Sequence, residues 1–239
     1  MKLSVIVPAY NEAERIEKSL LDISEFLKKQ AFEYEVLVVV DGAKDNTAEV
    51  VKKLETVVPN LRLINNQVNH GKGWVVRQGM LEAKGEWRLF TDADNSTSIE
   101  QINTFWPFTT AGYDIVIGSI EVAGAQINEN AQWYRRALGH WSKYLIRVVA
   151  GLWDIHDTQR GFKLFSAKAA EDIFSLAKID RFAFDIEILA LAKHLGYKIK
   201  EVPVIWNNAG GSTVSLSSYV EVFKDLIKIR LNLWSGKYK

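Results

Sequence analysis

The side chains best suited to chemistry are two aspartates that stand two positions apart, Asp92 and Asp94. They follow an apolar run, residues 87–90, that predicts a buried strand. Two carboxylates at the end of a strand can face one divalent cation, and Mg²⁺ or Mn²⁺ usually shares such ligands with substrate phosphates. We therefore predict a Mg²⁺ or Mn²⁺ site at these aspartates. A solvated acidic turn is the alternative for so short a motif.

A glycine-containing loop, residues 69–73, precedes a predicted helix that carries Arg77. Glycines permit a close approach of the backbone, and Lys72 and Arg77 could face a phosphate at the start of that helix. The loop matches neither the dinucleotide-binding motif nor the Walker A motif. It therefore predicts either a different phosphate-binding loop or an ordinary loop with a surface lysine.

The elements that must position these residues alternate over the first 120 positions. Strands are predicted at residues 3–7, 35–40, 61–64, 87–90 and 114–117, and helices at 11–29, 45–57 and 73–83. Such alternation forms parallel βαβ units, so we expect an α/β fold with a mostly parallel, twisted sheet flanked by helices. Ligands in these sheets bind beyond the carboxyl ends of the strands. Polar clusters at residues 10–12, 41–45 and 92–94 follow strands directly and should converge there.

The second half of the chain is less regular. It predicts helices at residues 131–153, 184–195 and 217–234 and a strand at 198–206. No linker or repeat interrupts the 239 residues, so we expect one domain over residues 1–239.

Composition excludes several classes of protein. Hydrophobic residues make up 48% and charged residues 25%, as in an ordinary globular protein. The net charge of +1 gives no reason to expect a nucleic-acid partner, and the absence of cysteine excludes disulfides and thiolate metal sites. No uncharged apolar stretch of about 18 residues is present, so the sequence predicts a protein that is soluble or lies on a membrane surface.

Several motifs, taken in their order, resemble one enzyme family. The whole resemblance runs from Leu3 to about Trp234. Pro8–Glu12, Asp41–Thr47, Asn69–Gly73 and Asp92–Asp94 are similar to the family 2 glycosyltransferases of the GT-A fold. His156–Phe165 and Arg181–Glu187 look like the branch that contains dolichyl-phosphate glucosyltransferases and polyprenyl-phosphate glycosyltransferases.

The resemblance implies a nucleotide-binding half over about residues 1–120 and a half that faces the acceptor and the membrane over about residues 121–239. It also implies a role for individual residues. Nucleotide-sugar binding falls to Pro8, Tyr10, Glu12, Asp41, Lys72, Arg77 and Asp92, with Asp41 near the base. Asp92 and Asp94 would hold the metal that bridges the diphosphate. Asp157, Gln159, Lys163 and Asp185 are the implied catalytic residues, of which Asp157 lies near the acceptor. Asp185 and Glu187 stand two apart on a predicted helix, so at most one of them should face the site.

Two positions depart from the pattern of the family. Val40 precedes Asp41 where relatives commonly have a pair of aspartates, and Ile120 follows Gly-Ser where the polyprenyl-phosphate branch commonly has arginine. If that arginine contacts the acceptor phosphate, its loss leaves the identity of the acceptor open. Arg135 and Arg136 are the candidate replacements.

The expected reaction is an inverting transfer of a sugar, glucose from UDP-glucose being favoured over mannose from GDP-mannose, to dolichyl or polyprenyl phosphate. A phosphate acceptor is already anionic, so it needs little help from a base, whereas the departing diphosphate needs positive charge. A soluble or polysaccharide acceptor is the second hypothesis, and its hydroxyl would require a base such as Asp157 or Asp185. A sugar-nucleotide-binding protein without turnover is the third.

Basic and aromatic side chains gather in two of the helices predicted for the second half of the chain. Residues 131–153 contain Arg135, Arg136, Lys143 and Arg147 together with Trp133, Tyr134, Trp141, Tyr144 and Trp153. In the final helix, a stripe of Tyr219, Val222, Phe223, Leu226, Leu233 and Trp234 is flanked by lysine and arginine. This composition suits a membrane interface, although packing on the sheet is the alternative. We expect a cytoplasmic protein that is peripheral on the cytoplasmic face of a membrane.

Overall fold

The computed structural model describes residues 1–128, 146–207 and 216–238, and the side chains of 127, 128 and 216–220 are not described. Its centre is a seven-stranded sheet in the order β3-β2-β1-β4-β7-β5-β8. The strands β1 (Leu3–Ala9), β2 (Tyr34–Asp41), β3 (Leu61–Asn66) and β4 (Trp87–Thr91) are parallel. Together with β5 (Ile115–Ser119), they confirm the five predicted strands. The α/β class is confirmed as well.

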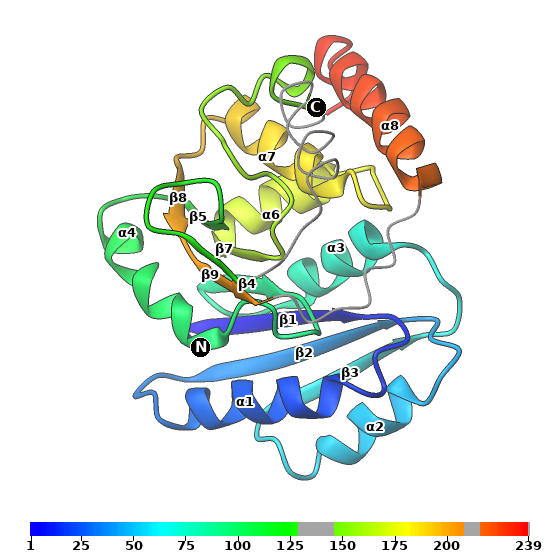
Figure 1. Ribbon diagram of the computed structural model, residues 1–239, viewed down its shortest axis with the longest axis vertical. Coiled ribbons are helices and arrows are strands. Elements are labelled where there is room, and N and C mark those ends of the chain that lie inside the picture. The colour runs from blue at the N-terminus through cyan, green and yellow to red at the C-terminus, as the bar shows by residue number, and fades with distance from the viewer. Residues whose placement is uncertain (129–145, 208–215, 239) are drawn as a thin grey trace.

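Helices cover both faces of the sheet (Figure 1). On one face lie α1 (Ile16–Lys28) and α2 (Thr47–Leu54), and on the other lie α3 (Lys72–Glu82), α6 (Ala167–Leu176) and α7 (Phe184–His194). Side chains of β1 alternate between the two apolar cores, Val5 and Val7 with α1 and Ile6 with α3. Burial of both faces explains why these strands are almost continuously apolar.

Helix α1 begins five residues later than the sequence predicts. Asn11 adopts a left-handed φ of 55°, and Glu12 accepts backbone bonds from Arg15 and Ile16 in a turn that precedes the helix. Residues 10–15 are thereby held as a loop at the carboxyl end of β1, where a ligand can reach them.

An antiparallel strand, β7 (Phe162–Ser166), lies between β4 and β5. The sequence did not predict it, because its short run lies outside the alternation of strands and helices from which the first five strands were predicted. Helix α6 follows at once and was also missed, although the hydroxyl of Ser166 caps it by accepting from the amide of Ala169. The shorter helices η1 (Ile99–Thr104) and α4 (Trp106–Thr110) were not predicted either. The sheet is thus parallel except at β7.

The predicted strand at 198–206 is two strands. β8 (Ile199–Pro203) pairs with β5 in the main sheet, whereas β9 (Ile205–Asn207) pairs with β6 (Gln126–Asn128) in a separate two-stranded sheet. The chain changes sheets at Val204, whose amide donates to the carbonyl of Ser119. The sequence could not reveal this break because both halves carry apolar residues.

The predicted helix at 131–153 is described only in part. Residues 146–150 are helical, and Gly151 then takes a φ of 73°, so the helix ends before Trp153. Arg135, Arg136, Lys143, Trp133, Tyr134, Trp141 and Tyr144 lie outside the described residues. The final helix is α8 (Leu216–Trp234), which packs against α7. Within the described ranges, no helix is both long and apolar enough to cross a membrane.

Candidate active site

The carboxyl ends of β1, β2 and β4 meet at one edge of the sheet, as the sequence predicts. Because β7 is antiparallel, its amino end reaches the same edge, and Thr91 at the end of β4 pairs with Phe162 at the start of β7. The amide of Asp92 donates to the carbonyl of Gly161 at 3.1 Å. The inserted strand therefore places the loop 157–161 directly beside Asp92.

Lys72 and Asp92 form the central ion pair of this edge. The Lys72 Nζ donates to Oδ1 of Asp92 at 2.6 Å, and both side chains are about one-third exposed. Burial lowers the pKa of Lys72, but the opposing attraction of Asp92 and Asp185 outweighs it, so the pKa is raised overall. Lys72 is therefore a permanent cation at neutral pH, next to a reachable carboxylate.

Asp41 anchors the loop that carries Lys72. Its two carboxylate oxygens accept the amides of His70 at 2.7 Å and Gly71 at 2.9 Å, and the side chain is almost fully buried. Gly71 has a φ of 107°, which favours glycine. The structure therefore shows Asp41 fixing the loop, and a contact with the nucleotide base stays a prediction.

Lys163 lies under the site and does not reach its surface. Its side chain is fully buried, and its Nζ donates to Oδ1 of Asp185 and to the carbonyl of Arg160, each at 2.5 Å. Burial raises the pKa of Asp185, while the attraction of Lys163 and Lys72 opposes that rise. Asp92, Lys72, Asp185 and Lys163 thus form a row of alternating charges that joins α3, β4, β7 and α7.

Glu187 turns away from this row. Its buried carboxylate accepts the amides of Lys178 and Ile179 and the hydroxyl of Tyr238. Asp185 alone of the two acidic residues on α7 meets the site cations. Glu187 instead joins α7 to the end of the chain.

Asp157 is committed to bonds within the protein. Its Oδ2 accepts the amide of Ile120 at 3.1 Å and Nε of Arg160 at 3.2 Å, and its Oδ1 accepts the amide of Gln159 at 3.3 Å. The side chain is buried. The carboxylate therefore holds the loop 157–160 against the end of β5, whereas Gln159 is exposed on that loop.

Arg160 is a residue of the site that the sequence did not single out, although it stands inside a quoted motif. Its guanidinium stacks on the ring of Trp206, 4.5 Å from the centroid, and is bonded to Asp157 through Nε alone. Within the part of the chain that the structure describes, its two terminal nitrogens donate to no residue. The cation lies close to the amide of Ile120, because both groups donate to the same oxygen of Asp157.

The remaining predicted residues divide into two groups. Glu12 pairs with Arg15 at 2.8 Å, and burial raises its pKa, with Asp94 and Asp92 adding to the effect and Arg15 opposing it. It therefore lies within electrostatic reach of the two aspartates, as predicted. Pro8 is buried in β1 and Tyr10 is exposed at its end. Arg77, by contrast, is not brought to the Lys72–Asp92 pair, because its guanidinium binds Asp180 at 2.7 Å and the carbonyl of Ala177.

The donor set at Asp92 and Asp94 fits a metal that is shared with a substrate. One oxygen of Asp92 is paired with Lys72, and Oδ1 of Asp94 accepts the amide of Ser96 at 2.9 Å, so each keeps a second oxygen. Among the described residues, no group of three or more His, Cys, Asp or Glu side chains could hold a metal. Mg²⁺ commonly takes one or two carboxylates and completes its shell with phosphates and water.

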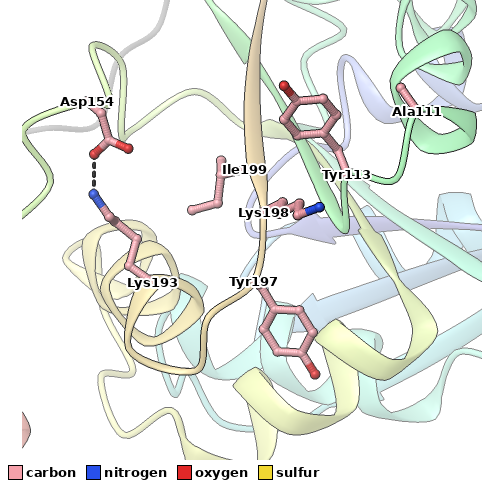
Figure 2. Close-up of a pocket in the computed structure, with 7 residues that line it drawn as sticks. All are labelled: Ala111, Tyr113, Asp154, Lys193, Tyr197, Lys198 and Ile199. Atoms are coloured by element: carbon pink, nitrogen blue, oxygen red, sulfur yellow. Dashed lines mark hydrogen bonds and ion pairs between the residues drawn. The ribbon is translucent and has the colours of Figure 1, made fainter.

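A hollow of about 470 Å³ lies elsewhere, beside the start of β8 (Figure 2). Because β8 runs parallel to β5, its amino end is at the edge opposite the site. Tyr113, Tyr197 and Ile199 line it together with an ion pair between Lys193 and Asp154. None of the predicted site residues contributes to this hollow.

Comparison with solved structures shows that the fold of the chain is the GT-A fold. A mannosyl-3-phosphoglycerate synthase from Rubrobacter xylanophilus superposes with a TM-score of 0.72 at 14% identity, over 99% of this chain and 75% of that one. A Mycobacterium tuberculosis glucosyl-3-phosphoglycerate synthase in complex with Mn²⁺, UDP-glucose and phosphoglyceric acid gives 0.67 at 18% identity, over 97% and 79%. These likenesses establish the fold.

The chain belongs to glycosyl transferase family 2, whose family profile matches residues 4–174. A dolichyl-phosphate beta-glucosyltransferase of Trichomonas vaginalis is 38% identical over 98% of this chain and 73% of its own length. The human dolichyl-phosphate beta-glucosyltransferase is 33% identical over 100% of this chain and 78% of its own length. The resemblance predicted from the motifs is confirmed.

Proposed function

We propose that this glycosyltransferase moves glucose from UDP-glucose to dolichyl or polyprenyl phosphate, with inversion at the sugar carbon. Its relatives named as dolichyl-phosphate beta-glucosyltransferases match nearly the whole chain, which supports the sugar and the lipid. The choice of a phosphate acceptor rests on one observation of the site. Both carboxylates that could act as a base are already engaged with other groups of the protein.

Asp157 and Asp185 are the two carboxylates that could deprotonate an acceptor hydroxyl. Asp157 already accepts two amides and Arg160, and Asp185 is buried against Lys163. A hydroxyl acceptor needs such a base, whereas a phosphate attacks as the anion that it already is. The site therefore suits a phosphate acceptor better than a soluble or polysaccharide hydroxyl.

The part of the site proposed to bind the donor contains two carboxylates and a lysine. Asp92 and Asp94 would hold Mg²⁺ or Mn²⁺, and such an ion neutralises the charge that grows on a departing diphosphate. Lys72 lies next to Asp92 and supplies a fixed cation for the same diphosphate. Pro8, Tyr10, Glu12 and Asp41 are proposed to line the nucleotide part of the pocket, and Gln159 to contact the reacting sugar.

Arg160 is our proposed ligand of the acceptor phosphate, in place of the arginine that Ile120 replaces. Its terminal nitrogens form the two-pronged donor that suits a phosphate, and Asp157 and Trp206 hold the guanidinium in place. Arg135 and Arg136 lie outside the described residues and stay candidates for the same role.

Arg160→Ala should raise the KM for polyprenyl phosphate by about tenfold or more and leave the KM for the donor within about twofold, as expected for loss of a charge-assisted contact. Arg160→Lys should reverse part of the rise in KM, because lysine keeps the positive charge but lacks the two-pronged guanidinium donor. An equal rise in both KM values would contradict the assignment.

The donor is tested by measuring nucleoside diphosphate release from UDP-glucose and from GDP-mannose, with and without polyprenyl phosphate. We expect fast release only from UDP-glucose and only with the lipid. Faster release from GDP-mannose would make mannose the sugar, and no stimulated release from either would favour a binding protein without turnover.

We further propose that residues 1–239 act as one domain, because the main sheet takes strands from both halves. We also propose that the enzyme works at the cytoplasmic face of a membrane.

A further inference from the structure

Helix α8 exposes a row of large apolar side chains. Phe223, Ile227, Leu231 and Trp234 are 46%, 43%, 54% and 72% exposed. They are spaced by four, four and three residues, so at about 100° per residue they share one face within an arc of about 80°. We name this row the apolar stripe. Tyr219 of the predicted stripe has no described side chain.

The apolar stripe is not the face that packs on the protein. Leu226 and Ile229 are buried in the core, and Val222 and Leu233 pack against it. The sequence predicted a single stripe that mixed Val222, Leu226 and Leu233 with Phe223 and Trp234, and the structure separates the two sets. A surface helix needs one apolar face for its own core, so the second face indicates a partner.

Cations flank the apolar stripe on both sides. Lys224 and Lys228 are exposed along one side, and on the other the Arg230 guanidinium lies 4.6 Å from the centre of the Trp234 ring. The nearest described acid on the helix surface, Glu221, lies toward the opposite face and pairs with Arg181. An apolar centre between cations is the pattern of a helix that lies in a lipid interface.

Residues 146–153, a short helix and the turn after it, extend the same surface. Gly151 lies beside α8, because a Cβ placed on it would stand 3.7 Å from Nη1 of Arg230. Val148 and Trp153, on either side of Gly151, are 37% and 59% exposed. Figure 1 shows this green segment next to the red α8 at one end of the molecule, with α1 and α2 at the opposite end.

We infer that the apolar stripe of α8, with Val148 and Trp153, lies in the headgroup region of an anionic lipid bilayer. A second copy of the chain fits less well, because a two-fold contact would bring like-charged margins together. The inference rests on the proposed function for its purpose, since a lipid phosphate stays in the membrane. The Glu221–Arg181 pair joins the start of α8 to the loop before Asp185, which connects the helix that carries the apolar stripe to an element of the site.

The test is flotation of the purified protein with vesicles of phosphatidylcholine alone and with about 30% phosphatidylserine, at low and high salt. We expect the wild type to float only with the anionic vesicles and to detach as salt rises. Leu231→Glu should lower the bound fraction about tenfold, because it puts a charge in the apolar centre. Val57→Glu is the matched control, since Val57 is 58% exposed at the far end of the molecule, and it should float like the wild type.

Light scattering and an acceptor comparison complete the design. A wild type that ignores anionic vesicles, or a Leu231→Glu variant that floats normally, would overturn the inference, as would a wild-type dimer that Leu231→Glu makes monomeric. With a short-chain prenyl phosphate in detergent, Leu231→Glu should retain wild-type turnover, whereas with long-chain acceptor in vesicles it should lose most of it. Failure of the proposed function would appear separately, as absence of transfer by the wild type to either acceptor.

Discussion

At the scale of single residues, position and not type decides what each aspartate does. Only one oxygen of Asp92 accepts a hydrogen bond, from Lys72, among the described residues. By contrast, both oxygens of Asp41 accept backbone amides, and both oxygens of Asp157 accept amides or the Arg160 guanidinium. Gly161 sets the position of Asp92, because a Cβ there would stand 2.1 Å from its carboxylate. Asp92 and Asp94 each keep an oxygen to which no described residue donates, and they are the carboxylates proposed to meet a metal.

Asp94→Ala should lower turnover by on the order of 10²-fold or more, because it removes one of the two carboxylates proposed to hold the ion that stabilises the diphosphate. The melting temperature should change little, since Asp94 contributes no core packing. Steady-state kinetics with added Mn²⁺, and calorimetric titration of Mn²⁺ in the presence of UDP, measure the two effects. Full activity of the wild type in a chelator would contradict the metal assignment.

At the scale of elements, the ion pair between Lys163 and Asp185 fastens β7 to α7. Lys163→Met should destabilise the fold by about 3–5 kcal/mol, because Asp185 then keeps a buried charge without its partner. The double variant Lys163→Met/Asp185→Leu should be more stable than the sum of the two single changes by about 1–3 kcal/mol. Urea unfolding of all four proteins gives the coupling, and additive losses would show that the two residues act independently.

The contact of Tyr238 with Glu187 fastens the end of the chain to α7 and is expected to depend on pH. Burial raises the pKa of Glu187 above its ordinary value of 4.5, and the Tyr238 hydroxyl opposes that rise. A raised folded pKa means that stability falls as the pH rises from the unfolded value through the folded one. Tyr238→Phe removes a hydrogen bond to the ionised Glu187 and so raises the pKa of Glu187 in the folded protein further. The stability lost through Tyr238→Phe is therefore greatest at pH values at which Glu187 is ionised.

Tyr238→Phe should therefore destabilise the protein by about 1–3 kcal/mol at neutral pH and by clearly less below the unfolded pKa of Glu187. Urea unfolding at neutral and acidic pH measures the difference. In Glu187→Gln, which cannot ionise, the Tyr238→Phe cost should be independent of pH. A cost that is the same at both pH values in the wild-type background would refute the coupling.

The same elements show what sequence reasoning can and cannot reach. Short runs rich in apolar residues, alternating with helical patterns, identify the five parallel strands, and the polar clusters that follow these strands locate Asp41 and Asp92. The strand β7 was missed because it lies outside the strand–helix alternation, and the burial of its Lys163 depends on a distant partner, Asp185. The hydrogen bonds that occupy Asp157 and the position of Arg160 depend on where β7 is inserted in the sheet. That placement is a property of the tertiary structure and cannot be read from a local pattern.

At the scale of the whole molecule, the site and the apolar stripe meet through one loop. Residues 177–181 bind Arg77 and contact Gly71 and Gly73, the glycines that flank Lys72, and they also pair with the start of α8. The edge of the sheet proposed to bind the nucleotide and the proposed lipid surface are thereby held by the same segment. A lipid acceptor anchored in a bilayer can then meet a donor that comes from the aqueous side.

The central claim is that the acceptor is a lipid phosphate attacked without a protein base. The most direct measurement compares polyprenyl phosphate with the matching polyprenol, which has the same chain and a hydroxyl in place of the phosphate, with UDP-glucose as donor. We predict glucose transfer to the phosphate and none above background to the alcohol, over the whole pH range in which the enzyme is folded. Transfer to the alcohol at a comparable rate would contradict the claim.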